Sequence, residues 1–146
     1  DAAFEIQFDA ESRFEFFVEV DNRTETVWPG SSLDSWGRKV QFYERYQDTR
    51  PERFRVLAIT TGGPARLSNM LRCAGELARN RRRSLVYGIG LNELLSTDEP
   101  VTDACFRNHL EQSVALLPPN RPALEPIPLT APVSLVTCAT CLRPLH

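Results

Sequence analysis

The chain has 146 residues, of which 42% are hydrophobic and 25% charged, and its formal net charge is −2. These values are typical of one globular domain with a core, and no apolar run approaches the roughly 20 residues that a membrane-spanning helix needs. We therefore expect a soluble protein with no membrane partner, and the slightly negative charge argues against a surface coated with phosphate-binding side chains.

The charge is distributed unevenly along the chain. Residues 1–52 carry 12 acidic and 6 basic side chains, whereas residues 53–83 carry 1 acidic and 8 basic ones. A metal-assisted phosphodiester site needs such a combination, because carboxylates hold the cation and arginines hold the phosphate backbone. The same distribution is also compatible with ordinary surface charge.

The first predicted element is an antiparallel β-hairpin. Residues 4–8 and 13–20 alternate apolar and polar side chains with a period of two, and residues 9–12 supply the turn. Phe17 interrupts the second alternation. This interruption indicates that both faces of the sheet are buried at that point.

Helices and short strands alternate after the hairpin. Apolar side chains three and four residues apart predict amphipathic helices over residues 33–46 and 64–80. Apolar and β-branched runs predict strands over residues 54–61 and 84–87. A further short helix is expected over residues 103–117.

The order hairpin, helix, strand, helix, strand predicts an α/β domain over residues 1–117, with a mixed β-sheet flanked by helices. Six prolines between positions 118 and 132 prevent regular backbone hydrogen bonding there. We expect residues 118–146 to form a Pro-rich tail, which contains the pair Cys138 and Cys141.

Acidic residues near the predicted hairpin form the most suggestive candidate site. Glu19 and Asp21 project from the same face of the second strand, and the start of the first strand brings Asp1 near them. Three carboxylates at one place suit Mg²⁺ or Mn²⁺, which take oxygen ligands. Lys39, the only lysine of the chain, is a candidate for holding the scissile phosphate. The alternative is that these are solvated surface charges.

The stretch from Phe14 to Glu25 (FEFFVEVDNRTE), followed by Lys39, Tyr43 and Tyr46, resembles the replication-relaxation family of plasmid and mobile-element proteins. The shared pattern is a hydrophobic strand that ends in Glu-x-Asp, a Thr-Glu turn, and a Lys with a Tyr several residues further on. The resemblance covers roughly residues 1–60. It implies a DNA-handling protein of replication or mobilisation, in which a winged-helix domain commonly precedes this region.

The element order also resembles the restriction-endonuclease-like core, whose motif is an Asp before one strand and Asp/Glu-x-Lys at the end of the next. Asp1 and Glu19 match the two acids, Asp21 stands where the motif has its Lys, and Lys39 would replace that Lys from the helix. The resemblance implies a divalent-metal-dependent nuclease. A catalytically inactive domain of the same fold, binding DNA or a replication protein, is the alternative.

An arginine cluster between positions 79 and 83 is the second candidate site. Its members are expected to contact nucleic-acid phosphates, because guanidinium groups match phosphate oxygens in geometry; they are Arg79, Arg81, Arg82 and Arg83. The alternative is that they only complement the dipole at the end of the preceding helix.

The cysteines define a third candidate site. Four cysteines without a secretory signal indicate a cytoplasmic protein with thiols or metal ligands rather than disulfides. Cys138 and Cys141 form one knuckle, and Cys105 and His109, four residues apart on the helix expected there, would complete a tetrahedral zinc site. Buried, unligated cysteines are the alternative.

Overall fold

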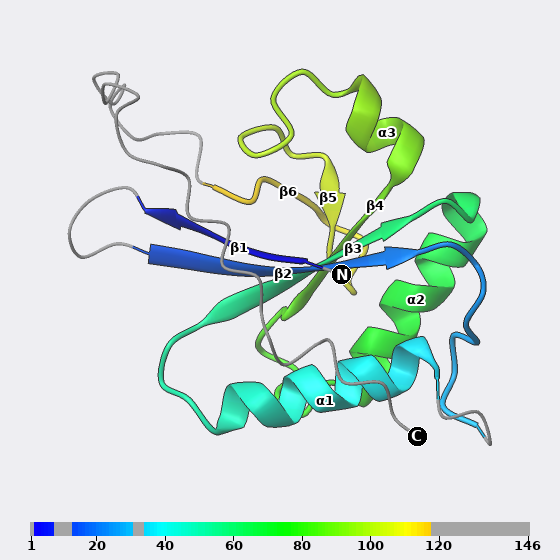
Figure 1. Cartoon of the computed structure of the whole chain (residues 1–146), viewed down its shortest axis with the longest axis vertical. Helices are drawn as coiled ribbons and strands as arrows, with labels where there is room; N and C mark the ends of the chain where they lie inside the picture. Colours follow the sequence, from blue (N-terminus) through cyan, green and yellow to red (C-terminus); the bar gives the residue numbers. More distant parts are fainter. Residues whose placement is uncertain (1, 8–12, 31–33, 118–146) are drawn as a thin grey trace.

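A six-stranded mixed sheet with the strand order β1-β2-β3-β4-β5-β6 lies at the centre of the molecule (Figure 1). The computed structural model describes residues 2–7, 13–30 and 34–117. The strands are β1 (Ala2–Gln7), β2 (Arg13–Asp21), β3 (Phe54–Thr60), β4 (Val86–Gly90), β5 (Phe106–Arg107) and β6 (Ser113–Val114). The helices are α1 (Trp36–Asp48), α2 (Gly63–Leu77) and α3 (Leu91–Ser96).

Strand direction changes across the sheet. β1 and β2 form an antiparallel hairpin in which Ala2 lies opposite Val18, whereas β2, β3 and β4 are parallel to one another. β4 and β5 are antiparallel, as are β5 and β6. The three parallel strands therefore end at one edge of the sheet, and the loops that follow them meet there.

Two helices cover one face of the parallel strands (Figure 1). α1 begins after Ser35, whose hydroxyl caps the helix by accepting a hydrogen bond from the Arg38 amide at 3.4 Å. The buried side of α1 and that of α2 pack together on β3 in one apolar cluster, which includes Trp36, Val40, Leu67 and Met70. Helical spacing of three and four residues places these side chains on the sheet-facing sides.

The opposite face of the sheet has its own core. Phe16, Leu57, Ile89 and Phe106 form a buried cluster there, and Leu94 of α3 packs against it. Phe17 points to the other face, into the cluster under α1 and α2. The prediction from the interrupted alternation of β2 is therefore confirmed.

The predicted α/β class, the mixed sheet, the hairpin and the two long helices are confirmed, with helix boundaries that differ by one to three residues. The predicted strand over residues 84–87 begins two residues later and extends to Gly90. Within the described residues, no helix is both long and apolar enough to cross a bilayer. The Pro-rich tail predicted over residues 118–146 lies outside the described residues.

The helix expected over residues 103–117 is wrong. This segment contains turns and the short strands β5 and β6. The Asn108 side chain accepts hydrogen bonds from the amides of Leu110 and Gln112, at 2.9 and 3.1 Å, and Glu111 has a left-handed φ of 59°. An Asn that bonds the local backbone in this way stabilises a turn at the expense of a helix.

Substitutions of two glycines in β4 test how closely α2 packs on the sheet. A Cβ added at Gly88 would lie 2.6 Å from Leu67 Cδ1, whereas a Cβ at Gly90 would meet no atom within 4 Å. We expect Gly88→Ala to lower the free energy of unfolding by about 1–3 kcal/mol through overpacking. Gly90→Ala should change it by less than about 0.5 kcal/mol. Urea denaturation measures both, and equal effects would contradict this packing.

Candidate functional site

The candidate site lies where β2 and β3 end. Their parallel register pairs Glu19 with Ala58 and Asp21 with Thr60, so these residues lie at one edge of the sheet. Glu19 and Asp21 share the face covered by α1 and α2, as the alternation of β2 predicts. The edge thus receives polar side chains from β2, β3 and both helices.

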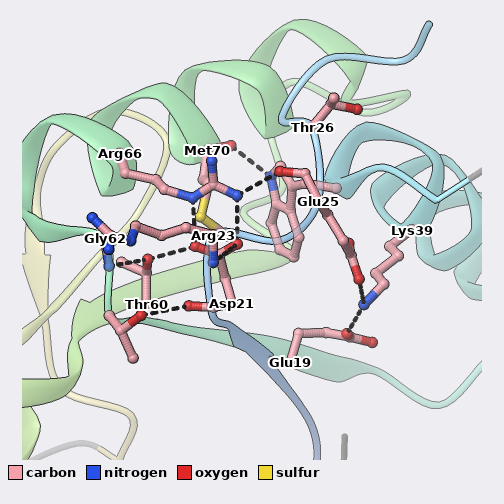
Figure 2. A network of polar contacts seen from close by, with 12 residues as sticks. Glu19, Asp21, Arg23, Glu25, Thr26, Lys39, Thr60, Gly62, Arg66 and Met70 are labelled. Atoms are coloured by element: carbon pink, nitrogen blue, oxygen red, sulfur yellow. Dashed lines mark hydrogen bonds and ion pairs between the residues drawn. The ribbon is translucent and has the colours of Figure 1, made fainter. Parts of the chain in front are cut away.

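Glu19 is buried, with 6% of its surface exposed, and both of its carboxylate oxygens have partners. Lys39 of α1 donates to Oε2 at 2.9 Å, and the Tyr43 hydroxyl donates to Oε1 at 2.6 Å. Lys39 also contacts Glu25 Oε1 at 3.0 Å (Figure 2). The ammonium group of Lys39 therefore lies between two carboxylates from different segments of the chain.

Asp21 forms a separate cluster with α2 (Figure 2). Arg66 contacts both of its carboxylate oxygens, through Nε at 2.6 Å and Nη2 at 2.5 Å. The Thr60 hydroxyl donates to Oδ2 at 2.6 Å, and the Arg23 amide donates to Oδ1 at 3.3 Å. This bidentate pair ties the end of β2 to α2.

The turn between β3 and α2 makes room for Arg66. A Cβ added at Gly62 would lie 2.4 Å from Arg66 Cδ, so only glycine allows the arginine to cross this turn. The Gly62 amide also donates to the Thr60 hydroxyl at 2.9 Å. This turn therefore positions the ion pair with Asp21.

The loop between β2 and α1 is attached to both helices. The backbone oxygen of Glu25 accepts from Arg66 at 2.7 Å, and the amide of Trp36 donates to the Thr26 oxygen at 2.9 Å. The Trp36 indole donates to the Met70 oxygen at 2.9 Å. These bonds hold Glu25 above the end of β2, within reach of Lys39.

Burial and ion pairs act in opposite directions on two titrating groups. Burial alone raises the pKa of Asp21, but the hydrogen bonds from Arg66 and Thr60 outweigh it and the pKa is lowered. Burial alone lowers the pKa of Lys39, but Glu19 and Glu25 outweigh it and the pKa is raised. Both groups are therefore charged at neutral pH.

The Lys39 ammonium lies between the carboxylates of Glu19 and Glu25. A hollow of about 10 Å³ lies beside them and Lys39, about the size of one water molecule. Within the described residues, no group of three or more His, Cys, Asp or Glu side chains is arranged to hold a metal ion. Two carboxylates nevertheless match Mg²⁺, which is often bound by one or two carboxylates together with substrate phosphates.

The acids predicted from the sequence are only partly brought together. Glu19 and Lys39 are in direct contact, and the phosphate-holding role of Lys39 stays a prediction. Asp21 lies at the same edge but is engaged by Arg66 instead of Lys39. Asp1 lies outside the described residues.

The arginine cluster from position 79 to 83 is divided among different surfaces. Arg79 pairs with Asp48 at 3.1 Å, and Arg83 pairs with the buried Glu44 at 2.8 Å. Arg81 lies beside α2 and Arg82 on the other side of the loop, where Arg83 also lies. Nucleic-acid contact by this cluster stays a prediction, but its members do not form one patch.

The zinc prediction placed Cys105 and His109 on one face of a helix, and this placement is wrong. Cys105 and His109 lie in turns on either side of β5 and not on a helix. The Cys105 thiol contacts the Pro100 oxygen at 3.5 Å, and His109 Nδ1 lies 3.3 Å from the Ser84 hydroxyl. Cys138 and Cys141 are outside the described residues, so zinc binding stays a prediction.

Sequence reasoning missed Thr60 and Arg66 as members of the site. A usable signal was present, because Thr60 ends a buried strand that is parallel to β2, and parallel strands end at the same edge. Nothing in the sequence shows that Arg66 forms an ion pair with Asp21.

Comparison of the chain with protein-family models, curated proteins and solved structures finds no match.

Replacing Asp21 tests the ion pair with Arg66. Asp21→Asn removes the charge that a half-buried guanidinium requires, so we expect the free energy of unfolding at pH 7 to fall by about 3 kcal/mol. Asp48→Asn, which breaks an exposed pair with Arg79, is the matched control and should cost about 1 kcal/mol or less. Chemical denaturation of the three proteins measures both changes.

The lowered pKa of Asp21 also predicts a pH dependence. A carboxyl group whose pKa is lower in the folded state contributes stability above its unfolded value of 3.8. That contribution is lost as the pH falls from this value through the lower folded pKa. Asp21→Asn should therefore flatten the acid limb of the stability curve, whereas a limb as steep as in the wild type would contradict the ion pair.

Proposed function

We propose that this chain is a DNA-handling domain with a restriction-endonuclease-like core, in which Glu19, Glu25 and Lys39 form a divalent-metal-dependent phosphodiester site. The observation that carries the proposal is the position of the Lys39 ammonium, 2.9 Å from Glu19 and 3.0 Å from Glu25. Two carboxylates converge there on a single cationic group. The resemblance of roughly residues 1–60 to the replication-relaxation family adds support.

The chain's own residues would divide the work at this site. Glu19 and Glu25 would hold the cation, and Tyr43 would keep the Glu19 carboxylate in place through its second oxygen. A bound Mg²⁺ or Mn²⁺ would polarise a phosphoryl oxygen and lower the pKa of a water molecule. Lys39, displaced from between the carboxylates, would contact the scissile phosphate.

The cluster around Asp21 has a structural role in this proposal. Its bidentate contact with Arg66 neutralises the carboxylate and fixes the ends of β2 and β3 relative to α2. Asp1 and Asp21, the other acids predicted as ligands, are not needed for a site in which substrate phosphates complete the metal coordination.

The engagement of Asp21 by Arg66 also favours a second candidate function. With Asp21 paired, two carboxylates remain among the described residues of this edge, and each of them contacts Lys39. A domain of nuclease-like fold with this arrangement would bind DNA or a replication protein without cleaving DNA. Salt-sensitive DNA binding without cleavage is the result that this alternative predicts.

Calorimetric titration of Mn²⁺ into the wild type and Glu19→Gln tests the metal site. We expect the wild type to bind Mn²⁺ and the variant to bind about 100-fold more weakly, because a direct ligand matters at least as much as its supporting groups. Glu76→Gln is the matched control, since Glu76 is an exposed acid on α2 away from this edge. It should bind as the wild type does.

Plasmid nicking in Mg²⁺ or Mn²⁺ then separates the two candidate functions. Loss of nicking in both Glu19→Gln and Lys39→Met, with Glu76→Gln active, is expected for the metal-dependent site. Nicking that survives Glu19→Gln, or a wild type that binds no Mn²⁺, would contradict it. DNA binding without any nicking would instead favour the non-catalytic domain.

A further inference from the structure

A hollow of about 650 Å³ lies at the edge of the sheet where β3 and β4 begin, opposite the edge that holds Glu19 and Asp21. Its volume is in the range of small-molecule binding sites. Five guanidinium groups line it, and we call it the arginine groove; they belong to Arg50, Arg53, Arg55, Arg82 and Arg83.

Three segments that are distant in sequence supply these arginines. Arg50 follows α1, Arg53 and Arg55 lie at the start of β3, and Arg82 and Arg83 lie in the loop before β4. The parallel pairing of β3 with β4 brings the two strand starts together, with Val56 opposite Val86. The groove is thus a product of the tertiary structure.

The positive charge of the arginine groove is only partly compensated. Glu15 is the one acidic side chain that lines it among the described residues, and it pairs with Arg50 at 2.8 Å. Arg83 pairs at 2.8 Å with Glu44, which is only 2% exposed. Within the described residues, the other three guanidinium groups have no carboxylate partner.

Two of the groove arginines are held in place by neutral or buried groups. Arg55 donates to the Leu116 oxygen and lies over the Tyr87 ring, 5.1 Å from its centroid. Arg83 is held by Glu44, and its buried Nε has no acceptor among the described residues. Side chains that are already ordered lose little conformational entropy when they bind a ligand.

The last two arginines of the groove, Arg53 and Arg82, are available to bind a ligand. Arg53 and Arg82 are exposed, and within residues 2–7, 13–30 and 34–117 neither guanidinium group makes an ion pair or a hydrogen bond. Their like charges next to Arg55 repel one another across the hollow. An anion with several oxygens would relieve this repulsion and match the planar donors of arginine.

We infer that the arginine groove binds the phosphate groups of a nucleotide or polynucleotide. A single carboxylate would leave most of the positive charge of the groove uncompensated, whereas a phosphate carries more negative charge and more acceptor oxygens. The groove is separate from the Glu19 centre, because Glu15, which lines the groove, lies four residues before Glu19 on β2, about 13 Å along the strand. The inference therefore stands whether or not that centre cleaves DNA.

Fluorescence polarisation with a labelled 20-nucleotide single strand, and with labelled ADP, tests the inference on the full chain. Arg53→Glu/Arg82→Glu should weaken binding about tenfold or more and reduce the salt slope by about 2. Arg38→Glu/Arg45→Glu changes the net charge equally from the exposed side of α1 and should alter affinity less than about threefold, since long-range charge effects are screened by salt. Circular dichroism checks the folding of each variant.

The two probes identify the source of the phosphate. Affinity that rises with oligonucleotide length indicates a polynucleotide backbone, whereas tight ADP binding that pyrophosphate displaces indicates a small phosphorylated ligand. Both results support the inference. The inference is overturned if neither probe binds, or if the groove variant and the control variant weaken binding equally.

Discussion

The parallel pairing of β2 with β3 is the constraint on which the rest of the structure depends. It makes the two strands end at the same edge, so that Asp21 lies beside Thr60 and two residue pairs away from Glu19. A parallel connection also requires a crossover, and α1 supplies it on the face to which Glu19 and Asp21 point. Glu19 therefore takes Lys39 and Tyr43 from α1 as its partners, whereas Asp21 takes Thr60 from β3 and Arg66 from α2.

Burial of these carboxylates is tolerated because each has a cation and a hydroxyl. Glu19 has Lys39 and Tyr43, and Asp21 has Arg66 and Thr60. An unpaired charge at this depth would cost several kcal/mol of stability. The two clusters differ in one respect that bears on function: the ammonium of Lys39 is shared by two carboxylates, whereas the guanidinium of Arg66 is committed to one. The cation exchange that we propose at Glu19 would therefore displace a shared ammonium group, whereas exchange at Asp21 would break a bidentate pair.

Much of the fold could be predicted because its signals are local. Alternation in β2, helical spacing in α1 and α2, and the apolar run of β3 each reflect which faces are buried. The helix expected over residues 103–117 failed for a local reason as well, since the side chain of Asn108 competes for the backbone. Part of the site was predictable in the same way, because Glu19, Asp21 and Lys39 were selected from strand alternation and residue type. The division of these residues into two clusters was not predictable, since it depends on how α2 is rotated.

The sequence by itself determined the α/β class, the hairpin, the sidedness of β2 and the concentration of arginine between residues 53 and 83, because these follow from periodicity and composition. Only the tertiary structure decided which cation meets which carboxylate. It paired Arg66 with Asp21 across 45 positions of sequence and separated Arg79, Arg81 and Arg82 onto different surfaces. The physical reason is that ion pairs and grooves depend on the relative placement of whole elements, which the packing of the two helices on the sheet sets.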